Sequence, residues 1–222
     1  MAYWDEVFKK EKIIWKNPDK SIIDLVPLLR KRKLKRILDL GCGAGRHIVY
    51  LCKRGFFVIG LDISSAALNL AQKWLEKEKI DNYCLVEGDM RKLQFPDEHF
   101  DVVISIGTIH HDVMEKLKRT VSEIRRVSKV KGLVFVTLVS KKDCKFGIGK
   151  KLETNTYQNG KVVHHFFDED GIKKLFSKFR IMKIKERAEV IPRKLLIHSN
   201  ILKKIKKKKV QSVHWQILAE KS

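Results

Sequence analysis

A buried strand that runs directly into a glycine-rich loop is the feature that most constrains the fold. Residues 37–47 read ILDLGCGAGRH, so an apolar run that contains one acid, Asp39, is followed by glycines at 41, 43 and 45. Glycine has no Cβ, so such a loop lets a ligand approach the backbone closely at the start of a helix. The dinucleotide fingerprint needs a small residue where this chain has Arg46. The loop therefore predicts a nucleotide-like cofactor without identifying it.

Two further carboxylates follow predicted strands. Asp62 ends the apolar run at 57–62, and a carboxylate there can accept hydrogen bonds from both hydroxyls of a ribose. NAD-binding proteins also carry an acid at this point, so Asp62 alone leaves the cofactor open. Asp89 follows the short strand at 83–87 and falls where an adenine amino group would be read, with Met90 beside it as an apolar floor for the ring.

These three signals occur in order, each at the end of a predicted strand. From about residue 20 to its end, the chain resembles the class I S-adenosylmethionine (SAM) methyltransferases, of methyltransferase-domain types 11 and 25. The resemblance implies that the glycine loop faces the methionine part of SAM, Asp62 binds the ribose and Asp89 the adenine. The alternative is another Rossmann protein whose acids only cap strand ends. The cofactor-binding residues implied are Asp39, Gly41, Cys42, Gly43, Gly45, Arg46, Asp62, Ile63, Gly88, Asp89, Met90 and Ile106.

Alternating strand and helix patterns predict an α/β, Rossmann-like, doubly wound sheet of seven strands, mostly parallel. Strands are expected at 36–40, 57–62, 83–87, 100–106, 132–139, 179–190 and 213–219, and helices at 3–15, 20–31, 45–54, 65–78, 113–128 and 169–177. Asp19 or Ser21 is expected to cap the second helix and Asp168 the last. The resemblance implies that the last strand enters antiparallel between the fifth and sixth. We expect one domain over 1–222, with an N-terminal helical lid at 1–31 and substrate-side cap segments at 140–167 and 191–212.

The loop after the fourth strand carries the candidates for catalysis, His110 and His111. Methyl transfer from a sulfonium requires an acceptor held in line and the exclusion of water, and a base is needed only if the acceptor must lose a proton. Histidine, with a pKa of about 6.5, suits that task, although either ring could instead pack or hydrogen-bond structurally. His165 and Trp15 are candidate substrate contacts, and the alternative is that they only close the cap.

The net charge of +22 points to nucleic acid or an anionic surface as a partner. Three lysines occur for each arginine, although arginine grips phosphates better, and the basic residues fall on both edges of the predicted sheet. One lysine-rich run, 203–209, lies on the edge expected to hold the cofactor. The charge therefore leaves tRNA open as a partner without favouring it.

Cysteine usage and the N-terminal sequence bear on metal binding and location. The four cysteines form no Cys-x-x-Cys pair, which argues against zinc and favours reduced thiols in a cytoplasmic protein. The N-terminal residues lack the pattern of a secretory signal, and no apolar run reaches the length of a membrane span. We therefore expect a cytoplasmic location and no metal.

The function expected is transfer of the SAM methyl group to an oxygen, nitrogen or sulfur of a small-molecule metabolite, with S-adenosylhomocysteine as the product. The alternative is a tRNA methyltransferase, because residues 104–111 and 123–127 look similar to wobble-uridine carboxymethyl methyltransferases. Protein methylation and a SAM-binding regulator without catalysis are further alternatives. The chain has no Asn-Pro-Pro-Tyr after the fourth strand and no Pro-Cys nucleophile, which argues against methylation of DNA bases.

Overall fold

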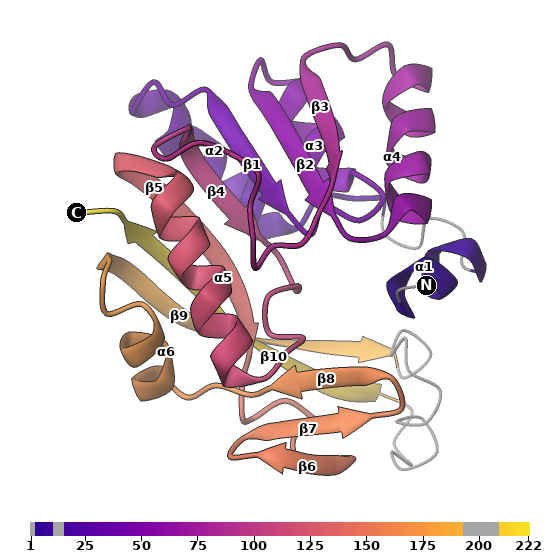
Figure 1. Ribbon diagram of the computed structural model, residues 1–222, viewed down its shortest axis with the longest axis vertical. Coiled ribbons are helices and arrows are strands. Elements are labelled where there is room, and N and C mark those ends of the chain that lie inside the picture. The colour runs from indigo at the N-terminus through magenta and orange to yellow at the C-terminus, as the bar shows by residue number, and fades with distance from the viewer. Residues whose placement is uncertain (1–2, 11–15, 193–208) are drawn as a thin grey trace.

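A seven-stranded sheet organises the chain in the computed structural model, which describes residues 3–10, 16–192 and 209–222 (Figure 1). The strand order is β3-β2-β1-β4-β5-β10-β9. Neighbouring strands from β3 to β5 pair in parallel, and β10 is antiparallel to both β5 and β9. The predicted fold class is confirmed, including the reversed last strand. The strands are β1 (Arg36–Leu40), β2 (Phe57–Asp62), β3 (Tyr83–Glu87), β4 (Phe100–Ser105), β5 (Ser128–Val139), β9 (Arg180–Pro192) and β10 (Lys209–Glu220).

Helices cover both faces of this sheet, as a parallel sheet requires. One buried cluster joins α2, α3 and α4 to Ile37 of β1, and the other joins α5 and α6 to Leu38 and Leu40 of the same strand. This alternation along one strand places the two clusters on opposite faces. No helix in the described ranges is long and apolar enough to cross a membrane. The helices are α1 (Tyr3–Lys10), α2 (Lys20–Lys31), α3 (Arg46–Cys52), α4 (Ser65–Lys77), α5 (Met114–Val127) and α6 (Glu169–Leu175).

Side-chain caps set the starts of three helices. The side chain of Asp19 accepts a hydrogen bond from the Ser21 backbone N–H at 2.8 Å and begins α2. Ser64 caps α4 in the same way, and Asp168 caps α6. Each cap satisfies a backbone donor that the first turn of a helix leaves without a partner. The predicted caps at Asp19 and Asp168 are therefore confirmed.

A second, three-stranded antiparallel sheet forms within the cap segment 140–167, where the sequence pattern predicted no strands. This small sheet comprises β6 (Lys150–Glu153), β7 (Thr156–Asn159) and β8 (Val162–His165), and it lies at the bottom of the view in Figure 1. Each strand has only four residues, too few for an alternation of apolar and polar residues to stand out. The His165 backbone N–H donates to the His110 carbonyl at 2.9 Å, so β8 is joined to the loop after β4.

Candidate active site

The glycine loop is shaped by backbone that only glycine tolerates. Gly41 has a φ of 75°, and its N–H donates to the Leu61 carbonyl at 2.7 Å. A Cβ on Gly41 would lie 2.2 Å from Cγ2 of Thr108, so a side chain here would clash as well as strain the backbone. Thr108 belongs to the loop after β4, which also carries His110 and His111 and is called the histidine loop. The glycine loop and the histidine loop are therefore in direct contact.

Asp62 fastens the glycine loop to the end of β2. Its Oδ2 accepts from the Gly43 N–H at 2.8 Å, and its Oδ1 accepts from the Ser64 N–H at 3.0 Å. Burial raises the pKa of this carboxyl, and the two hydrogen bonds oppose that rise. The side chain thus lies where the sequence places it, with both oxygens already engaged by backbone.

Asp39, at the end of β1, leaves a polar atom unsatisfied. The side chain is 1% exposed, and its Oδ2 has no hydrogen-bond partner among the described residues. Nδ1 of His47 lies 3.7 Å from this oxygen. Buried acceptors without partners are rare in folded proteins, so this oxygen calls for a donor. An ammonium group, which SAM carries on its methionine part, is a donor of the right kind.

Asp89 has a local partner that the sequence pattern did not reveal. The Arg91 guanidinium bonds both carboxylate oxygens, and the Arg91 backbone N–H donates to Oδ1 at 2.8 Å. Hydrogen bonding to Arg91 lowers the pKa of Asp89. Arg91 also reaches Asp112 at 3.3 Å. An adenine amino group at this position would share the carboxylate with Arg91.

The other residues implied for the cofactor differ in exposure. Cys42 is buried, which raises the pKa of its thiol, whereas Ile63 is 42% exposed. The Gly88 N–H donates to the Asp62 carbonyl at 3.0 Å, which brings the end of β3 next to that of β2. Trp15 lies outside the described residues. The carboxyl ends of β1, β2 and β3 thus gather at one edge, where ligands of such sheets bind.

Three imidazoles meet where the histidine loop contacts the small sheet. The ring centroids of His110 and His111 lie 4.4 Å apart, and those of His111 and His164 lie 4.6 Å apart. His111 Nδ1 lies 3.2 Å from the carbonyl oxygen of Val163. A carbonyl only accepts, so Nδ1 carries the proton and Nε2 carries the lone pair. His110 is 2% exposed, and burial lowers its pKa well below the usual value.

His164 is the functional candidate that sequence reasoning missed. Its neighbour His165 is the residue predicted to contact substrate, but Nδ1 of His165 lies 2.6 Å from the Thr156 hydroxyl within the small sheet. Successive side chains of a strand point to opposite faces, so His164 and His165 have different surroundings. The paired histidines were a visible signal. Which of them faces His110 depends on a strand that the pattern did not predict.

Helix α1 contacts both loops of the site. Phe8 lies 3.3 Å from where a Gly43 Cβ would be, and the Trp4 ring is edge-on to His111 with centroids 5.1 Å apart. Asp5 accepts from the Ala66 N–H at 3.0 Å and from Oγ of Ser64 at 2.8 Å, and these bonds lower the pKa of Asp5 to about 2. Asp5 therefore anchors α1 at the start of α4.

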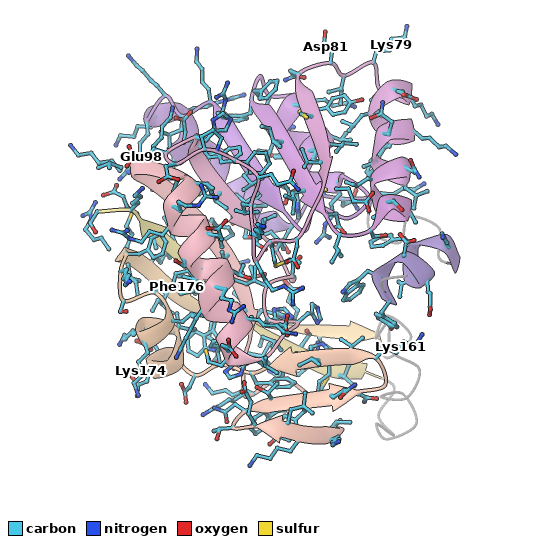
Figure 2. The ribbon with its side chains drawn as sticks, viewed as in Figure 1. Lys79, Asp81, Glu98, Lys161, Lys174 and Phe176 are labelled. Carbon is cyan, nitrogen blue, oxygen red and sulfur yellow. The ribbon has the colours of Figure 1, made fainter. Side chains whose placement is uncertain are left out.

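Lys161, in the turn between β7 and β8, pairs with Glu6 of α1 at 3.0 Å, and Figure 2 shows Lys161 on the side of the sheet toward that helix. This exposed ion pair closes the ring of contacts around the site: glycine loop, histidine loop, small sheet and α1. A mostly parallel sheet with carboxylates at one edge and one reversed strand between β5 and β9 resembles the arrangement of class I SAM-dependent methyltransferases.

Comparison with known proteins gives the same class. Residues 37–132 match the family model described as "Methyltransferase domain", and the chain is similar to class I SAM-dependent methyltransferases. The YcgJ protein of Bacillus subtilis has a TM-score of 0.72 at 16% identity, covering 91% of this chain and 99% of that one. A SAM-dependent methyltransferase from Methanosarcina mazei has a TM-score of 0.70 at 18% identity, covering 88% and 97%. At these identities the two structures establish the fold alone.

Curated relatives share the domain and differ in what they act on. The tRNA N(3)-cytidine methyltransferase METTL2 of Gallus gallus is 28% identical over 160 residues, which are 67% of this chain and 43% of the relative. The sterol 24-C-methyltransferase ERG6B of Gibberella zeae is 36% identical over 129 residues, which are 56% of this chain and 30% of the relative. The human EEF1A lysine methyltransferase 2 is 29% identical over 154 residues, 61% and 65%. The chain thus spans less than two thirds of each relative.

Proposed function

We propose that the protein transfers the methyl group of SAM to an oxygen, nitrogen or sulfur atom of a small-molecule metabolite. The observation that carries the proposal is the coverage of His110 and His111. Trp4 of α1 packs on one side, and His164 of the small sheet lies against both rings. An acceptor held within this cover is shielded from bulk water, as methyl transfer requires.

The residues of the carboxyl edge suit SAM. The unsatisfied Asp39 Oδ2 would accept from its ammonium group, the glycine loop would leave room for its methionine part, and Asp62 would bind its ribose. Asp89 would read the adenine together with Arg91. When bound, SAM supplies a sulfonium-activated methyl group, whose carbon–sulfur bond breaks as the acceptor's lone pair forms the new bond.

The histidine loop would act on the acceptor. His111 keeps an unprotonated Nε2 because its Nδ1 donates to Val163, so the ring can take a proton from the acceptor as the new bond forms. The Thr108 hydroxyl donates a hydrogen bond to the Gly41 carbonyl, which joins this loop to the glycine loop. The acceptor would therefore be held next to SAM. Holding the two reactants in line supplies much of the rate enhancement.

The charges around the site favour a small acceptor over RNA. Lys141 pairs with Asp168, Lys142 with Glu186, and Lys145 with Asp143 at 3.7 Å. An ammonium that already has an acidic partner contributes less to a phosphate-binding surface. Much of the positive charge on this part of the rim is thus compensated within the fold.

A tRNA substrate is the second candidate. The observation that favours it is the relative METTL2, described as a tRNA N(3)-cytidine methyltransferase, together with the net charge of +22. Incubation with labelled SAM and either total tRNA or a small-molecule extract from the same source separates the two. We expect label in the small-molecule fraction. Label confined to tRNA would overturn the preferred substrate class.

The lysine run 203–209 provides a second test, although most of it lies outside the described residues. For a metabolite substrate, replacing four of its lysines with Gln should leave the Michaelis constant nearly unchanged, because a solvated charge run makes no contact with a small acceptor. For tRNA, the same change should weaken binding and reduce the salt slope by about 0.7–0.9 per lost phosphate contact.

The matched control replaces Lys31, Lys33, Lys35 and Lys178 with Gln. These exposed lysines precede β1 and β9 and so lie at the opposite edge of the sheet. A salt-dependent loss of tRNA binding in the 203–209 variant but not in this control would reverse the ranking of the two substrates.

A further inference from the structure

We propose that His110, His111 and His164 form a binding site for a divalent transition-metal ion, with Zn²⁺ as the test case. The inference rests on the proposed function and specifies how the histidine loop acts on the acceptor. The cysteine spacing in the sequence predicts no metal, and it carries no information on these histidines. His110 and His111 lie on the loop after β4, and His164 lies on β8. Because the fold brings these two segments together, the spacing of the histidines in the sequence does not predict the cluster.

The geometry is the first argument. The three imidazoles each offer one nitrogen, and these three atoms all lie within 4.8 Å of one another. Zinc binds histidine nitrogen at about 2.0–2.1 Å, so tetrahedral ligand nitrogens lie about 3.4 Å apart. Rotation of the His110 and His164 rings can close this difference. The backbone is already tied in place, because the His165 N–H donates to the His110 carbonyl.

The hydrogen bonds of the His110 and His111 rings also favour a bound cation. Nδ1 of His111 is held by the Val163 carbonyl, which leaves Nε2 as a ligand atom of fixed orientation. A backbone carbonyl on the far ring nitrogen is the usual outer support of a metal-bound histidine. Nδ1 of His110 is buried and has no hydrogen-bond partner among the described residues. A buried ring nitrogen without a partner is costly, and a bound cation at the cluster would compensate for it.

The surrounding charge is compatible with a cation. The ammonium group of Lys145 is close enough to interact with His110, and it pairs with the Asp143 carboxylate at 3.7 Å. The ring centroid of a further imidazole, that of His214, lies 6.1 Å from that of His110.

Such a site would have three protein ligands and an open fourth position, the pattern of catalytic rather than structural zinc. A metal ion there supplies positive charge that lowers the pKa of an acceptor O–H, N–H or S–H. The acceptor would then lose its proton to water on coordination, before it is enclosed for methyl transfer, and His111 would act as a metal ligand in place of its role as a base. A heteroatom that coordinates zinc is therefore the acceptor type expected.

The test uses the full chain without a histidine tag, stripped with a chelator and titrated with Zn²⁺ in a calorimeter. Co²⁺ then replaces Zn²⁺ to report the ligand geometry through its visible spectrum. We expect one tight site in the wild type and a loss of affinity of at least about tenfold in His111→Ala and in His164→Ala. His164→Asn, checked by circular dichroism, serves if His164→Ala fails to fold.

The control is His99→Ala, because His99 lies beside Arg36 and Phe95, away from the cluster. Zn²⁺ bound equally by the wild type, the cluster variants and this control would overturn the proposal, as would the lack of a tight site. SAM titration of the same samples separates the two claims. Binding of SAM without Zn²⁺ rejects the metal site alone, and binding of Zn²⁺ without SAM rejects the proposed function while the metal site stands.

Discussion

Replacing His111 with alanine is expected to lower the turnover number at least about a hundredfold and to leave SAM affinity close to that of the wild type. A lost general base costs about 10²–10⁴ in rate, and a lost metal ligand acts on the same step. The ring lies on the loop after β4, while most of the residues assigned to SAM lie at the carboxyl ends of β1, β2 and β3. Single-turnover rates and calorimetric SAM affinity, measured on the same preparation, give the two quantities.

The control for this experiment is again His99→Ala, which removes an imidazole outside the site and should keep both quantities. The His110→Ala variant should behave like His111→Ala if it folds, since the two rings are neighbours. Wild-type turnover in both variants would show that neither ring activates the acceptor. Catalysis would then depend on positioning alone.

The Asp62→Ala variant should bind SAM at least tenfold more weakly than the wild type. The carboxylate would lose its hydrogen bonds to the ribose, each worth about 1.5–3 kcal/mol when one partner is charged. It would also lose those from the Gly43 and Ser64 N–H groups, which hold the glycine loop in place. Isothermal titration with SAM measures the effect, and thermal unfolding checks that the variant is folded.

Asp101→Ala is the matched control. Asp101 also accepts from two backbone N–H groups, those of Lys35 and Arg36 at 2.9 and 2.8 Å, but at the opposite edge of the sheet. Both variants therefore remove a carboxylate that binds backbone. A loss of SAM affinity in Asp62→Ala alone ties the effect to the site. An equal loss in both would mean that Asp62 matters only for the stability of the sheet.

The main sheet could be predicted from the sequence because its strands are long apolar runs. The predicted bounds of β1, β2 and β3 match the structure, and β4 differs by one residue at its end. Strand β5 begins earlier than expected, at Ser128 rather than 132. The small sheet was missed, since polar strands such as β6 present no apolar face to detect.

The candidate site also combines features that the sequence predicts with contacts that it does not. Residues at strand ends, such as Asp62, lie at the predicted edge of the sheet, because topology alone brings the carboxyl ends of parallel strands together. Contacts between side chains distant in sequence were not predictable, and the meeting of His110 with His164 is one of them. The pairing of Asp89 with Arg91 is local, but a motif that assigns an acid to adenine says nothing of its other partners.

Calorimetric titration of the wild-type chain with SAM and, separately, with NAD tests the central claim most directly. Both cofactors carry an adenosine, so Asp62 and Asp89 alone could serve either. The glycine loop, with Arg46 after Gly45, and the unsatisfied Asp39 Oδ2 favour SAM. We predict saturable binding of SAM and of S-adenosylhomocysteine with no measurable binding of NAD. Tight binding of NAD and none of SAM would contradict the account.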